Sequence, residues 1–187
     1  KKIIYIFLIN VLLLTNSNAL IEVDITRGNL DPLPIAVSPL HVDIKSENFQ
    51  NLKVKDLGSE IAKIIEKNFK NTGLFNPLKK EAFVQKPEIA HLKPRFEDWR
   101  LIKAQALVTG KLLIKNEKLK VEFRLWDLTA AQEMTALAFT TTPSNWRRVA
   151  HIISDKIYER LTGEEGYFDT RIIYVAESGP KRQRVKK

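Results

Sequence analysis

Apolar side chains recur at helical spacing in one early stretch of the chain and predict a helix over residues 58–71. Ser59 can cap the first turn, and Gly73 can adopt the left-handed conformation that ends many helices. The apolar face of this helix would consist of Ile61, Ile64, Ile65 and Phe69.

A second helical stripe lies between Ser144 and Gly163. Ser144 is the candidate N-cap and Gly163 the candidate stop. The apolar positions of the stripe are Trp146, Val149, Ala150, Ile153, Ile157 and Leu161. A helix with one apolar face has to bury it against another element, so both helices are expected to pack on a sheet.

Alternation of apolar and polar residues predicts strands between the two helices. Residues 119–125 alternate strictly, and an apolar, β-prone run at 104–114 precedes them across a turn at Asn116 and Glu117, which indicates a hairpin. The remaining predicted elements are strands over residues 35–37 and 133–142, a short helix over 96–103 and a loop-rich stretch over 79–94. This order predicts an α/β fold with a mixed sheet of about five strands and flanking helices.

The first nineteen residues have the pattern of a secretory signal. Lys1 and Lys2 give a basic start, residues 3–14 are apolar, and the small residues Ser17, Asn18 and Ala19 follow. About a dozen apolar residues are fewer than the roughly 20 that span a bilayer, so a cleaved signal is favoured over a membrane anchor. We expect cleavage after Ala19 and no integral membrane segment afterwards.

The amino-acid composition excludes some classes of function for this chain. The chain has no cysteine, which excludes disulfides, thiolate nucleophiles and Cys-ligated metals. Of the net charge of +9, two charges come from Lys1 and Lys2 and five from the basic residues of 181–187, so the rest carries only +2. A basic stripe with stacking aromatics is not evident, so nucleic acid is not an expected partner.

No motif in the sequence points to catalysis, a cofactor or a metal. Arg147 and His151 lie one helical turn apart beside Trp146 and Arg148, but this pattern is more typical of an apolar stripe bordered by solvated arginines. His41, His91 and His151 lack metal-ligand spacing, and neither a Gly-rich phosphate loop nor a G-x-S-x-G elbow occurs. The sequence therefore predicts no enzyme, no cofactor and no metal site.

Several ordered blocks of sequence resemble the TolB family. They are IEVDITRGNLDPLPIAV, IAKIIEKNFKNTGLFNPL, FEDWRLIKAQALVTGKL, VEFRLWDL and NWRRVAHIISDKIYERLTGEEGYFDTRIIYV. The resemblance implies three parts: a signal peptide over residues 1–19, a TolB N-terminal α/β domain over 20–163, and over 164–187 a linker with the truncated start of a β-propeller. Residues 171–176 would be an orphan propeller strand.

The resemblance also implies a role in the cell envelope. Members of the family are periplasmic adaptors that link TolA with Pal in the Tol-Pal system, which supports outer-membrane integrity and envelope constriction during cell division. Pal is bound by the propeller, so Pal binding is not expected here. The alternative to an adaptor is a non-functional remnant of a truncated or split gene, which the DNA beyond codon 187 would distinguish.

By position, the segment that contacts the TolA C-terminal domain in the family corresponds to Leu20, Ile21, Glu22, Val23, Asp24, Ile25 and Thr26. An extended segment with alternating apolar residues can add to the edge of a sheet through its backbone, with alternate side chains filling pockets. The alternative is an edge strand of the chain's own domain or a loose terminus.

Overall fold

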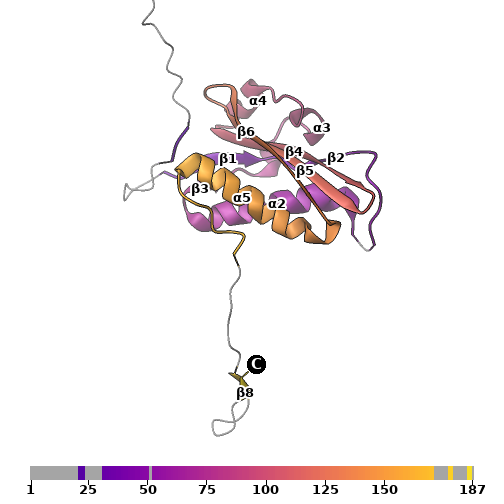
Figure 1. Cartoon of the computed structure of the whole chain (residues 1–187). Coiled ribbons are helices and arrows are strands. Elements are labelled where there is room, and N and C mark those ends of the chain that lie inside the picture. The colour runs from indigo at the N-terminus through magenta and orange to yellow at the C-terminus, as the bar shows by residue number, and fades with distance from the viewer. Residues whose placement is uncertain (1–20, 24–30, 51, 171–176, 179–184, 187) are drawn as a thin grey trace, which may run out of the picture.

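A six-stranded mixed sheet forms the centre of the fold (Figure 1). The computed structural model describes residues 21–23, 31–50, 52–170, 177–178 and 185–186. The strands run in the order β3-β1-β4-β5-β6, and β2 pairs with β4 beside β1. Their bounds are β1 (Leu33–Val37), β2 (His41–Val42), β3 (Phe75–Pro77), β4 (Ala106–Lys115), β5 (Lys118–Asp127) and β6 (Gln132–Thr141).

The sheet combines a parallel half with an antiparallel meander. Strand β1 is parallel to both β3 and β4, and helix α2 (Val54–Thr72) provides the crossover to β3. Strands β4, β5 and β6 are antiparallel neighbours. The turn between β4 and β5 places Asn116 and Glu117 at φ 51° and 55°, as a tight two-residue hairpin requires. The predicted mixed α/β fold is confirmed, with the two-residue β2 as the sixth strand.

Helices cover both faces of the sheet, as Figure 1 shows. The long helices α2 and α5 (Trp146–Thr162) pack side by side on one face, where their apolar stripes meet the sheet in the main core. A second core lies on the other face, beneath α3 (Pro87–Ala90), α4 (Phe96–Leu101) and the 3-10 turn η1 (Lys80–Ala82), and centres on Trp99, Leu107 and Trp126.

The two long helices end where the sequence predicts but begin elsewhere. Gly73 and Gly163 adopt left-handed φ values of 72° and 75°, so both predicted stops are confirmed. Helix α2 starts four residues earlier than predicted, at Val54, because Val54 and Leu57 are buried in the core; Ser59 therefore lies inside the helix.

The predicted cap of the second helix is also wrong. Ser144 belongs to the 3-10 turn η2 (Pro143–Asn145), and Asn145 precedes α5 without a side-chain cap hydrogen bond. The Ser144 hydroxyl instead lies 3.1 Å from the hydroxyl of Thr142. Pro143 and Trp146 are both buried where the helix begins.

The predicted signal (residues 1–19) and the predicted propeller strand (171–176) lie outside the described residues. The proposed division of the chain at residues 163 and 164 therefore stays a prediction. Further along, β7 (Glu177–Ser178) pairs antiparallel with β8 (Val185–Lys186). Among the described ranges, no helix has the length and apolar character needed to cross a membrane.

Candidate partner-binding segment

The described residues of the predicted partner-binding segment lie against the chain's own domain. Of its seven residues, Ile21, Glu22 and Val23 are described, whereas Leu20, Asp24, Ile25 and Thr26 lie outside the described residues. Ile21 and Val23 are half-buried and pack against the main core, and Glu22 between them is exposed. The predicted alternation is therefore present at these three residues, although they belong to no strand.

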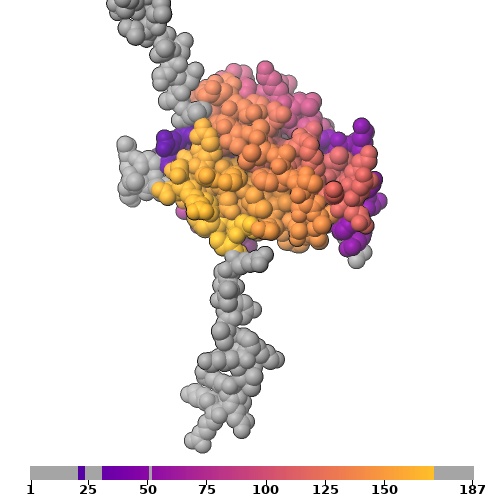
Figure 2. Space-filling model, in the orientation of Figure 1, coloured from indigo at the N-terminus to yellow at the C-terminus, as the bar shows by residue number. Residues whose placement is uncertain are grey.

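Two hydrogen bonds donated by backbone N–H groups hold this start of the described chain. The Ile21 N–H donates to Oδ2 of Asp127 over 3.0 Å, at the end of β5. The Val23 N–H donates to the Leu161 carbonyl oxygen over 2.7 Å, near the end of α5. Figure 2 shows the indigo start of the described chain against the yellow end of α5. Elements more than 100 residues away in sequence thus position the segment.

Asp127 connects the segment to the turn between β5 and β6. Its side chain is fully buried, and Oδ1 accepts hydrogen bonds from the N–H groups of Thr129 and Ala130, both over 2.8 Å. Arg100 reaches the same turn by donating from Nε to the Leu128 carbonyl oxygen over 2.6 Å. An aspartate at the end of a strand signals a turn in the sequence, but its contact with residue 21 carries no local signal.

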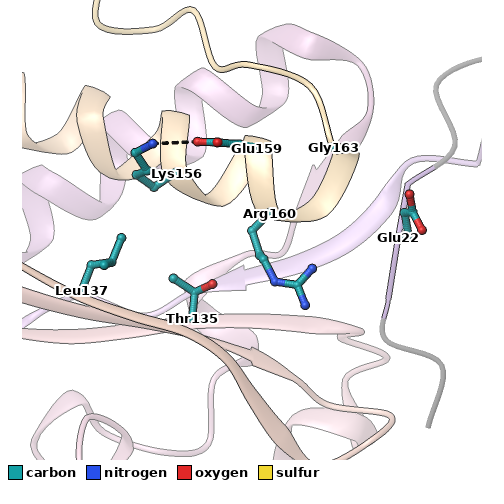
Figure 3. Close-up of a pocket in the computed structure, with 7 residues that line it drawn as sticks. All are labelled: Glu22, Thr135, Leu137, Lys156, Glu159, Arg160 and Gly163. Carbon is teal, nitrogen blue, oxygen red and sulfur yellow. Dashed lines mark hydrogen bonds and ion pairs between the residues drawn. The ribbon is translucent and has the colours of Figure 1, made fainter. Parts of the chain in front are cut away.

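A groove lies beside the docked segment, between the edge strand β6 and helix α5. It has a volume of about 800 Å³. Figure 3 shows Glu22 at one end and Leu137 and Lys156 toward the other, with Arg160 extending from α5 into the space between them. The lining residues are Glu22, Thr135, Leu137, Lys156, Glu159, Arg160 and Gly163.

Charged side chains on α5 line the groove in a mixed pattern. Lys156 donates to Glu159 over 2.7 Å, and this hydrogen bond raises the pKa of Lys156 above its ordinary value of 10.5. Leu137, in the middle of β6, is 40% exposed. The groove offers an open strand edge and side chains of both charges.

The arginine-rich start of α5 has structural contacts that explain its residues. The guanidinium of Arg147 lies 4.2 Å from the ring centroid of Trp146, and Arg148 forms an ion pair with Asp169 at 3.0 Å. Nδ1 of His151 lies 3.0 Å from Nδ2 of Asn68, on the facing helix α2. Trp146 is buried, whereas Arg147 and Arg148 are exposed, which fits an apolar stripe bordered by solvated arginines.

The other two histidines meet in space, which the sequence did not indicate. The rings of His41 and His91 stack with centroids 4.5 Å apart and an interplanar angle of 11°. His91 also places Nδ1 3.0 Å from the Pro87 carbonyl oxygen. Within the described part of the chain, no three metal-ligating side chains come together.

The fold with its docked amino-terminal segment defines a class of small α/β domains, and comparison with known proteins identifies the class. The family model described as the TolB amino-terminal domain matches residues 21–134, more than half of the chain. The chain belongs to this family, so the resemblance of the ordered sequence blocks is confirmed.

A curated relative is the Tol-Pal system protein TolB of Pelagibacter ubique (strain HTCC1062). It is 67% identical over 185 residues, which make up 98% of this chain and 42% of the relative. The chain therefore spans less than half of that protein's length. A crystal structure of TolB from Acinetobacter baumannii matches with a TM-score of 0.62 and 23% identity, covering 78% of this chain and 32% of that one, and it shows the fold.

Proposed function

We propose that this chain is a periplasmic adaptor component of the Tol-Pal system, exported by residues 1–19, that contacts the C-terminal domain of TolA through residues 20–26. The observation that carries the proposal is the docking of Ile21 and Val23, which are half-buried on either side of the exposed Glu22 and each donate one backbone N–H hydrogen bond to the described part of the domain. A segment held in this way at the surface is available for exchange onto a partner's sheet edge.

Docking on the domain and addition to a partner's sheet compete for the same groups. Strand addition uses backbone N–H and C=O groups and places alternate side chains in pockets. Ile21 and Val23 already use their N–H groups and side chains within the chain. A typical hydrogen bond contributes about 1 kcal/mol net, and one to a charged group about 1.5–3 kcal/mol. Binding of a partner with micromolar affinity releases about 8 kcal/mol of free energy. This is enough to displace both hydrogen bonds.

The proposed division of the chain and the absence of a catalytic role are taken from the TolB family. Residues 20–163 form the α/β domain, and residues 164–187 form a linker and the start of a propeller. The TolB family consists of non-enzymatic envelope proteins, and we assign this chain no catalytic step.

A pull-down with the C-terminal domain of TolA tests the proposed site. The chain from residue 20 should be retained, and a chain that starts at residue 27 should be lost. The paired change Ile21→Ser and Val23→Ser should also abolish retention, whereas Glu22→Ala, on the exposed position between them, serves as the matched control. Thermal melting of each variant establishes that it is folded. Equal retention of the chains from residues 20 and 27 would overturn the proposed site.

A further inference from the structure

A groove lined by lysines lies between α2 and the residues that follow β3 on the chain. It has a volume of about 500 Å³. Lys63, Lys67 and Lys70 come from α2, where their spacing of four and three residues places them on one exposed face of the helix. Lys79 and Lys80 come from the chain after β3. Because β3 packs against α2, lysines from two separate elements share one concave surface, the lysine groove.

The lining of the lysine groove carries an excess of positive charge. Against its five lysines, the described lining residues provide two carboxylates, those of Glu66 and Glu81. Residues 3–180 as a whole have a net charge of only +2, so the excess is a local feature. Lys63 pairs with Glu60 at 2.6 Å, but this ion pair is exposed to solvent, and such pairs are weak. A concave surface lined by charges of one sign attracts ions of the opposite sign.

The lining suits phosphate groups that are arranged on a surface. A lysine ammonium group binds phosphate as a compact point charge, without the fixed geometry that an arginine imposes. The row from Lys63 to Lys70 is about 10 Å long at a rise of 1.5 Å per residue, so it can contact neighbouring phosphates together. Pro77 and Leu78 add half-buried apolar atoms, which suit the carbon skeleton of a lipid headgroup. The described lining includes no aromatic ring on which a nucleobase could stack.

We propose that the lysine groove binds the phosphate groups of anionic lipid headgroups, so that this face of the domain rests on a membrane surface. Clustered basic side chains are attracted to such a surface, and each one adds to the binding. The proposal takes from the proposed function only the location in the cell envelope. It uses a different part of the domain, because none of the described residues of the partner-binding segment lines the lysine groove.

Co-sedimentation of the chain from residue 20 with lipid vesicles tests the proposal without any protein partner. The vesicles contain phosphatidylglycerol and phosphatidylcholine, and vesicles of phosphatidylcholine alone are the uncharged reference. The chain should bind the anionic vesicles and not the reference. The combined changes Lys67→Gln, Lys70→Gln and Lys79→Gln should weaken binding about 100-fold, which corresponds to about 2.8 kcal/mol. All three lysines are exposed, so the variant should keep its fold, and thermal melting checks this.

A matched control removes the same charge elsewhere. Lys45, Lys115 and Lys118 are exposed and do not line the lysine groove, so their combined change to glutamine should weaken binding less than about threefold. The basic residues of 181–187 are present in every variant and contribute equally to all. If the two triple variants lost binding equally, the vesicles would be sensing net charge, and the proposed site would be overturned.

Glu66→Gln provides a change of the opposite sign. Glu66 lies 4.0 Å from Lys80 and is one of the two carboxylates of the described lining. Its neutralisation should tighten binding to the anionic vesicles about threefold, and unchanged or weaker binding would contradict the site. Displacement of the chain from the vesicles by glycerol phosphate at constant ionic strength would assign the groove to a soluble phosphate compound and overturn the membrane contact. Tighter, groove-dependent binding to an oligonucleotide would overturn it as well. None of these results depends on TolA, so they are separate from the pull-down.

Discussion

Replacement of Gly58 by alanine tests the packing of α2 against the chain that follows β1. Gly58 is buried in the helix, and its carbonyl oxygen accepts a hydrogen bond from the Leu40 N–H over 3.2 Å. A Cβ atom at residue 58 would lie less than 3.0 Å from the backbone carbonyl oxygen of Leu40, closer than real Cβ atoms come. The backbone on one side has to move, because no flexible side chain can yield.

The expected cost follows from three contributions. Overpacking costs about 1–3 kcal/mol, and weakening of the Leu40 hydrogen bond costs about 1 kcal/mol. Alanine in place of glycine in a helix returns about 1 kcal/mol. The sum is a loss of about 2 kcal/mol in the free energy of unfolding, and the Tm should fall by about 4–8 °C.

Thermal and urea unfolding followed by circular dichroism measures this change. Ser59→Ala is the matched control, because it adds helix propensity at the next position without placing an atom against Leu40. It should leave the Tm unchanged or slightly raised. If Gly58→Ala were as stable as the native chain or more stable, residue 58 would be an ordinary helix glycine and the close contact with Leu40 would be wrong.

Two further stability predictions concern single side chains. Trp126 donates from Nε1 to the buried Thr109 hydroxyl over 2.9 Å, so Trp126→Phe should cost about 1–3 kcal/mol in denaturant unfolding. Adding Thr109→Val should cost less than the sum of the two single changes; additive costs would contradict the hydrogen bond. Burial raises the pKa of Glu66 above its ordinary value of 4.5, so the folded state disfavours its charged form. Glu66→Gln should therefore increase the free energy of unfolding at pH 7 by about 0.5 kcal/mol and raise the Tm. This gain should vanish near pH 3, where Glu66 binds the proton in both the folded and the unfolded chain. A lower Tm at pH 7 would show that the 4.0 Å approach of Lys80 to Glu66 outweighs the burial.

Much of the fold is predictable because its periodicity is local. The meander of β4, β5 and β6 follows from alternation and from the turn at Asn116 and Glu117. Both helix stops follow from single glycines. The start of α2 was missed because the polar residues around Val54 and the glycine at residue 58 resemble a loop. The helix is extended by tertiary contacts. Val54 and Leu57 are buried in the core, and Leu40 closely approaches Gly58.

The candidate site was predictable only in part. Alternation near residue 21 indicates an extended segment, and the family resemblance indicates what it binds. Its docking depends on Asp127 and Leu161, more than 100 residues away, and no local pattern encodes such contacts. The stack of His41 on His91 was missed for the same reason, because one ring comes from the short strand β2 and the other from the end of α3.

In the proposed function, residues 20–26 form the contact with TolA, and the docking of Ile21 and Val23 on their own domain has to be released first. Calorimetric titration of the TolA C-terminal domain with a synthetic peptide of residues 20–32, compared with the chain from residue 20, tests it most directly. The peptide has no docking contacts to break, so it should bind at least as tightly as the chain. Binding by the chain without binding by the peptide would contradict the proposed contact. The groove between β6 and α5 would then be the next candidate for the binding site.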